Sequence, residues 1–116
     1  MDTSDRGMLD IERFDTEPGR PLFHGLIEEK DLPGNWSSIS PEQRMKLTLN
    51  IVGGETISDR MKFSIAEIGK TISTWPQLAS SVLHGGAVTA QACRLLALGK
   101  PVRSGRFYID AEQVII

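Results

Sequence analysis

Residues 78–98 read LASSVLHGGAVTAQACRLLAL, the longest weakly polar stretch of the chain. The stretch is about as long as a membrane span. However, it contains His84, Gln91 and Arg94 among many small residues. We therefore predict a buried helix of a soluble domain here, and no contact with a membrane.

The flanking residues give this helix its predicted ends. Thr74-Trp75-Pro76-Gln77 resembles a capping box, so the helix is expected to run from about Trp75 to Leu98. Gly99 is suited to end it. Gly85-Gly86 inside the helix costs roughly 1 kcal/mol per glycine, so we expect close packing or a bend at this point.

Two further helices precede it. Ser40-Pro41-Glu42-Gln43 has the pattern of a capping box with proline at the first helical position, which predicts a helix from Pro41 to Val52. The second helix is capped by Thr56 or Ser58. Its apolar residues recur at i, i+4, i+7 and i+11, which predicts one buried face: Met61, Ile65, Ile68 and Ile72.

Short strands are predicted near both ends of the chain. Residues 8–15 alternate loosely, and Arg106–Asp110 is rich in strand-forming residues. Residues 22–30 could form a short helix. The fold class is therefore α/β, a helix-rich mixed fold with about three main helices.

Composition limits the class of protein. The chain has 116 residues, 40% of them hydrophobic and 24% charged, and its net charge is -2. These values predict one globular domain over residues 1–116. The charges are interspersed and slightly acidic, which argues against nucleic acid as a partner. The N-terminus lacks the pattern of a secretory signal, so we expect a cytoplasmic protein.

Isolated histidines and a single cysteine predict no metal site and no catalytic residue. Cys93 and His84 would lie about 13.5 Å apart along one helix axis, too far to form a nucleophilic pair. Cys93 is expected to be a small buried residue. His24 is expected in a loop, and His84 to donate a hydrogen bond in the core. The roles of all three remain open.

The polar cluster Ser4-Asp5-Arg6-Gly7 directly precedes the first strand. Arg6 could hold a carboxylate or phosphate through two parallel hydrogen bonds. An Asp5–Arg6 pair that only fixes a turn is the competing interpretation.

Three runs in the second half, residues 74–82, 84–87 and 104–110, resemble the later part of bacterial ThiF-type, E1-like (HesA/MoeB/ThiF) adenylating proteins. Residues 4–14 resemble the segment that enters the second half of the same domain. The resemblance therefore extends over nearly the whole chain.

The resemblance implies a Rossmann-like domain that uses ATP and Mg to adenylate the C-terminus of a small carrier protein, and that often dimerises. The glycine-rich nucleotide loop and the acidic residues of the first half of that domain have no match here. The chain thus resembles the C-terminal part of a larger adenylating domain. We expect no cofactor in this chain, no catalytic residue, and a homo-oligomer.

The resemblance also yields a substrate-binding prediction. Ligands of open α/β sheets lie beyond the carboxyl ends of the strands. If residues 1–3 are the end of such a strand, Ser4, Asp5 and Arg6 would face the nucleotide or carboxylate in the intact protein. His24 is predicted as a more distant member of this site. Two other functions remain open: a non-catalytic interaction or dimerisation module, and a small independent enzyme that uses Arg6 and a histidine.

Overall fold

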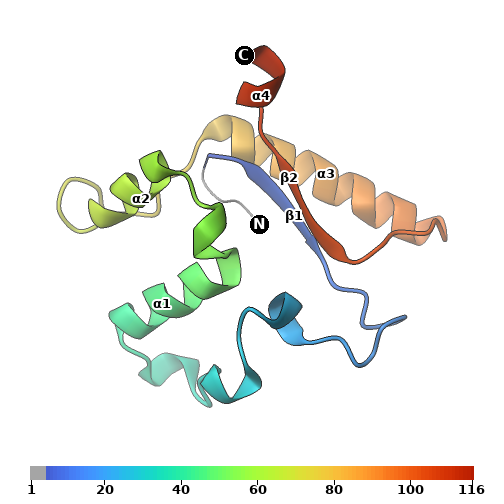
Figure 1. The fold of residues 1–116 in the computed structure, drawn as a ribbon, viewed down its shortest axis with the longest axis horizontal. Helices are drawn as coiled ribbons and strands as arrows, with labels where there is room; N and C mark the ends of the chain where they lie inside the picture. Colours follow the sequence, from blue (N-terminus) through green and yellow to red (C-terminus); the bar gives the residue numbers. More distant parts are fainter. Residues whose placement is uncertain (1–4) are drawn as a thin grey trace. The chain divides into compact units, whose positions relative to one another are not determined.

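The computed structural model describes residues 5–116, and the contacts within the chain divide it into two compact units (Figure 1). The sheet unit contains residues 5–11 and 57–116, and the α1 unit contains residues 12–56.

The sheet unit is built on two antiparallel strands, β1 (Gly7–Ile11) and β2 (Gly105–Ile109). Asp10 lies opposite Arg106 in their register. The long helix α3 (Ala79–Ala97) packs along β1, as Figure 1 shows. Helices with short strands near both ends confirm the predicted helix-rich mixed α/β class.

Close backbone contact joins α3 to β1 at a glycine. A Cβ on Gly7 would lie 3.0 Å from the amide nitrogen of Gly85 and 3.2 Å from the carbonyl oxygen of Ser81. Both Gly7 and Gly85 are buried. The expectation of close packing at Gly85 is therefore confirmed, whereas Gly86 is exposed with nothing within 4 Å of a Cβ.

The start of α3 differs from the prediction. Leu78 precedes the helix in an extended conformation without a side-chain cap, so the capping box at Thr74 is wrong. The residue before a proline is biased away from the helical region, and Trp75 precedes Pro76. The predicted end is confirmed, because Gly99 adopts a positive φ of 66°.

Helix α2 (Asp59–Ala66) is shorter than its apolar pattern suggests. Ser58 caps it, and Met61 is buried, as expected. A turn follows in which Gly69, at a φ of 82°, donates its N–H to the carbonyl of Ile72. Ile68 and Ile72 therefore do not belong to the helix, and the prediction of a four-residue helical face is wrong for them.

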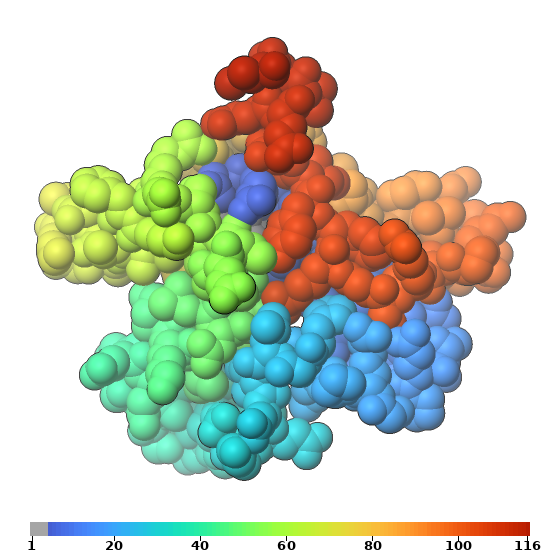
Figure 2. All heavy atoms as spheres, in the orientation of Figure 1, coloured from blue at the N-terminus to red at the C-terminus, as the bar shows by residue number. Residues whose placement is uncertain are grey.

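A short helix, α4 (Glu112–Ile115), follows β2. In the space-filling view it projects from the rest of the sheet unit (Figure 2). Val114 and Ile115 are accordingly exposed. The buried apolar residues of this unit are Met8, Ile57, Met61 and Ala92.

The α1 unit contains helix α1 (Pro41–Val52), whose bounds and capping box are as predicted. Ser40 accepts a hydrogen bond from the N–H of Gln43, and the Gln43 side chain accepts one from the N–H of Ser40. The expected helix over residues 22–30 is wrong. That segment instead contains two separate 3-10 turns, Leu22–Gly25 and Glu29–Asp31.

Across residues 5–116, no helix is both long and apolar enough to cross a membrane.

Candidate functional site

A polar hollow of about 390 Å³ lies where β1 begins. It is lined from three directions: by residues before β1, by the N-terminal end of α2, and by the connection from β2 to α4. The lining side chains carry two guanidinium groups, three carboxylates and a hydroxyl, and they are those of Asp5, Arg6, Ser58, Arg60, Asp110 and Glu112. The structure thus places two predicted site residues, Asp5 and Arg6, in one hollow, which we call the Asp5 hollow.

Arg6 is positioned by an aromatic ring on β2. Its guanidinium carbon lies 5.4 Å from the centroid of the Tyr108 ring, within the range of a cation–π interaction. Because side chains alternate along a strand, Arg6, Met8 and Tyr108 belong to the sheet face away from α3. The stacking fixes the guanidinium at the rim of the hollow.

The carboxylate of Asp5 has one oxygen that accepts no hydrogen bond from the described residues. This oxygen, Oδ1, is buried. Asp5 also lines an adjoining hollow of about 120 Å³ together with Arg60, Pro76 and Leu78. A buried carboxylate oxygen without a donor is costly, so a ligand or water that donates a hydrogen bond would be stabilised here.

An ion pair and a hydrogen bond join three of the residues that line the Asp5 hollow. Arg60 of α2 donates to Glu112 of α4 at 3.2 Å, and both side chains are exposed. Asp110 accepts a hydrogen bond from the N–H of Glu112 at 3.0 Å. These contacts leave the hollow with mixed charge, suited to a polar ligand that both donates and accepts hydrogen bonds.

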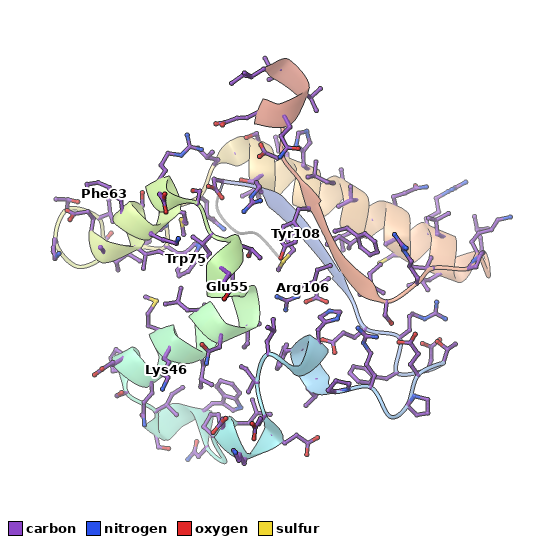
Figure 3. The ribbon with its side chains drawn as sticks, in the orientation of Figure 1. Lys46, Glu55, Phe63, Trp75, Arg106 and Tyr108 are labelled. Carbon is purple, nitrogen blue, oxygen red and sulfur yellow. The ribbon has the colours of Figure 1, made fainter. Side chains whose placement is uncertain are left out.

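Next to this region, β1 and β2 are joined by an ion pair that the sequence did not reveal. The Nε of Arg106 donates to the Oδ2 of Asp10 at 2.8 Å, and the two side chains are only 11% and 13% exposed. Arg106 lies on the same strand as Tyr108 (Figure 3). The pair lies between directly opposed residues 96 positions apart in the chain, a separation that no local pattern can indicate.

The remaining predicted site residues are placed differently. Ser4 lies outside the described residues. His24 belongs to the α1 unit, where it and Phe23 both adopt positive φ, at 56° and 49°. Glu12 accepts a hydrogen bond from the N–H of Phe23, and Arg20 lies 2.5 Å from the Nδ1 of His24. Left-handed backbone at residues other than glycine persists only where neighbours hold it, as these two contacts do here.

The expectations for Cys93 and His84 are wrong. Both residues lie on α3 and both are exposed. Neither is therefore a core residue, because α3 buries only the narrow side that meets the sheet.

That narrow side leaves most of α3 uncovered. Its buried residues are Ser81, Gly85 and Ala92. Its open side includes exposed apolar and small residues: Val82, Leu83, Gly86, Ala90, Cys93 and Ala97. Leu83 is 71% exposed. The prediction of a buried helix is therefore wrong for this side.

Comparison with known proteins finds a relative of this chain among the curated proteins. No family model matches the chain, and no solved structure matches it. An uncharacterized protein of Mycobacterium tuberculosis is 39% identical over 115 residues, which make up 99% of this chain and 16% of that protein. Almost the whole chain is therefore similar to a part of this relative. The chain spans about one sixth of the relative's length.

Proposed function

We propose that this chain is the C-terminal portion of a cytoplasmic ThiF-type adenylating protein, that it is not catalytic alone, and that it supplies a docking surface on α3. In the intact protein, ATP and Mg would act on the C-terminus of a carrier protein. The resemblance of residues 4–14, 74–82, 84–87 and 104–110 to that family supports the adenylating part of this proposal.

The open side of α3 is the observation that carries the docking part. Leu83, Gly86, Ala90, Cys93 and Ala97 follow one another at intervals of three and four residues. This is the spacing of residues in a seam between two helices, where each seam residue enters a gap on the partner. Small residues in the seam allow the two backbones to approach closely.

The described residues do not fit the phosphates of ATP. A phosphate site of this kind requires backbone N–H groups at a helix start that follows a strand through a glycine-rich turn. Within residues 5–116, α4 is the helix that directly follows a strand, and its connection, Asp110–Ala111, contains no glycine. The Asp110 carboxylate already accepts a hydrogen bond at that helix start and would repel a phosphate. We therefore assign no step of adenylation to this chain.

A second candidate function is a non-catalytic dimerisation module, in which a second copy covers the open side of α3. The open space at Gly86 favours this alternative, because a neighbouring helix could approach there without a clash. The two functions differ in what covers α3: the rest of a longer chain or another copy of this one.

The first test measures nucleotide binding and assembly of the isolated chain. We expect no micromolar ATP binding by calorimetry and no ATP–pyrophosphate exchange. Light scattering over a hundredfold dilution from near millimolar concentration is expected to show a dimer or higher oligomer. Leu83→Lys is expected to give monomers, whereas Val114→Lys, at an apolar site on α4 that is exposed as well, leaves the mass unchanged.

The outcomes separate the parts of the proposal. Micromolar ATP binding would contradict the non-catalytic assignment. A monomer at every concentration would contradict the expected homo-oligomer and the dimerisation module. The segment that precedes the matched region in the Mycobacterium tuberculosis relative is expected to contain a glycine-rich strand–turn–helix, and its absence there would contradict the adenylating assignment.

A further inference from the structure

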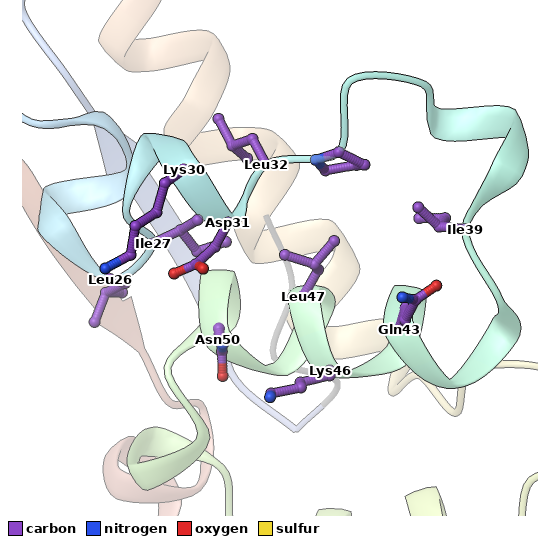
Figure 4. A pocket seen from close by; sticks show the side chains of 11 residues that line it. Leu26, Ile27, Lys30, Asp31, Leu32, Ile39, Gln43, Lys46, Leu47 and Asn50 are labelled. Atoms are coloured by element: carbon purple, nitrogen blue, oxygen red, sulfur yellow. The ribbon is translucent and has the colours of Figure 1, made fainter.

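A hollow in the α1 unit is separate from every residue of the proposed function. Its volume is about 470 Å³, within the range of pockets that bind small molecules. Helix α1 forms one wall, and residues between 26 and 39 form the other (Figure 4).

The α1 wall and the apolar stripe of α1 are different faces of the helix. Gln43, Lys46, Leu47 and Asn50 recur at i, i+3, i+4 and i+7, so they share one face. Met45, Leu49 and Val52 form a different stripe of the same helix. Three of the four residues are polar and partly open to solvent, so a ligand in the hollow could reach their side chains.

These polar residues mainly offer hydrogen-bond donors. The Oε1 of Gln43 already accepts from the N–H of Ser40 at 2.8 Å, which leaves its NH2 group for a ligand. The ammonium of Lys46 makes no ion pair with any of residues 5–116. Lys30 on the opposite wall is engaged by Glu28 at 2.6 Å. Lys46 is therefore the cation best placed to receive an anion.

The rest of the lining is mostly apolar. It comprises Leu26, Ile27, Leu32, Pro33, Ile39 and Leu47, with Asp31 as its one carboxylate. Asp31 comes from the wall opposite α1 (Figure 4), so an anionic group is favoured on the Lys46 side and an apolar body between the walls.

We propose that this hollow binds a small amphipathic anion: a carboxylate or similar head at Lys46, hydrogen-bonded by Asn50, with an apolar body against Leu26, Ile27 and Leu47. A charge-assisted hydrogen bond supplies the preference for an anion, and burial of the apolar body supplies the rest of the affinity. This inference does not depend on the adenylating assignment.

The test uses three ten-carbon probes that differ only in the head group: decanoate, decanol and decyltrimethylammonium, each below its micelle concentration. Backbone amide shifts of the whole chain are followed by NMR during each titration. Decanoate is expected to shift the amides of Ile27, Leu47 and Asn50 and to bind more tightly than the other two probes.

Substitutions of Lys46 then measure how much its positive charge contributes to binding. Lys46→Ala is expected to weaken decanoate binding about fivefold and to leave decanol binding unchanged. Lys46→Glu is expected to reverse the order of decanoate and decyltrimethylammonium. Lys62→Ala, a control on α2 where the lysine pairs with Asp59, should change nothing.

Three results would overturn the inference. They are equal affinity for the three probes, unchanged decanoate binding by both Lys46 variants, and shifts confined to the open side of α3. The last result would show that the probes only adhere to exposed apolar surface. None of these results bears on ATP exchange or on the Leu83→Lys experiment, so the two proposals can fail separately.

Discussion

The two sides of α3 follow opposite rules. The covered side contains serine, glycine and alanine, which bring the helix backbone against β1. The open side contains Val82 and Leu83, which are larger and remain exposed. Within one helix, size therefore does not predict burial: the small residues permit the contact with the sheet, and the larger ones stay exposed.

Ion pairs in the sheet unit also differ between buried and exposed positions. Breaking the buried pair is expected to cause the largest loss of stability. Asp10→Ala leaves the mostly buried Arg106 without its carboxylate, so we expect the free energy of unfolding to fall by about 3–5 kcal/mol. Glu112→Gln, which breaks the exposed pair with Arg60, is expected to cost less than about 1 kcal/mol. Urea denaturation measures both, and equal losses would contradict the contrast.

A substitution at the glycine contact tests the covered side of α3 directly. Gly7→Val places carbon atoms against the backbone of Ser81 and Gly85, which cannot rotate away, so we expect a loss of about 3 kcal/mol. Gly86→Ala, one residue along on the open side, is the matched control. It is expected to raise stability by up to about 1 kcal/mol, because alanine favours the helix and meets nothing there.

A stability change of the opposite sign in either variant would contradict the contrast between the two sides of α3. A Gly7→Val variant as stable as the wild type would mean that helix and strand can separate without loss. A destabilised Gly86→Ala variant would place a contact on the side described as open. If Gly7→Val does not fold, Gly7→Ala gives the same comparison with a smaller loss.

The smallest expected effect comes from an exposed pair in the α1 unit. Arg13 donates two hydrogen bonds to Asp15, at 2.8 and 2.7 Å, and they lower the pKa of the Asp15 carboxyl. Because the folded pKa lies below the unfolded one, this contribution to stability is present above the unfolded pKa and is lost as pH falls through the folded pKa.

An NMR titration of the Asp15 carboxyl measures that shift. Arg13→Gln is expected to return the pKa towards its ordinary value, whereas Arg44→Gln leaves it unchanged. An Asp15 pKa that is the same in the wild type and in Arg13→Gln would show that the pair does not persist in solution.

The sequence predicted local features well and distant ones poorly. The bounds of α1 were predicted because Ser40, Gln43 and Gly53 lie within one helix length and act on its own backbone. Helix α2 was predicted too long, because the apolar period continues through Ile68 and Ile72 although Gly69 begins a turn. Burial of α3 was mispredicted, since apolar composition does not specify which side has a neighbour.

The candidate site shows the same limit. Asp5 and Arg6 were predicted together because they are adjacent in the chain. Arg60, Asp110 and Glu112 reach the Asp5 hollow from far along the chain, so their spacing carried no signal. The single-domain prediction for residues 1–116 and the expected homo-oligomer stay predictions.

The pairing of β1 with β2 has a consequence for the time course of folding. Asp10 and Arg106 are 96 residues apart, so their strands can meet only after almost the whole chain has been drawn into a loop. Closing a loop of that length costs about 4 kcal/mol of chain entropy before any strand contact compensates for it. Helices α1 and α3 form from near neighbours, so we expect them to precede the sheet and the ladder between the two strands to form late and slowly.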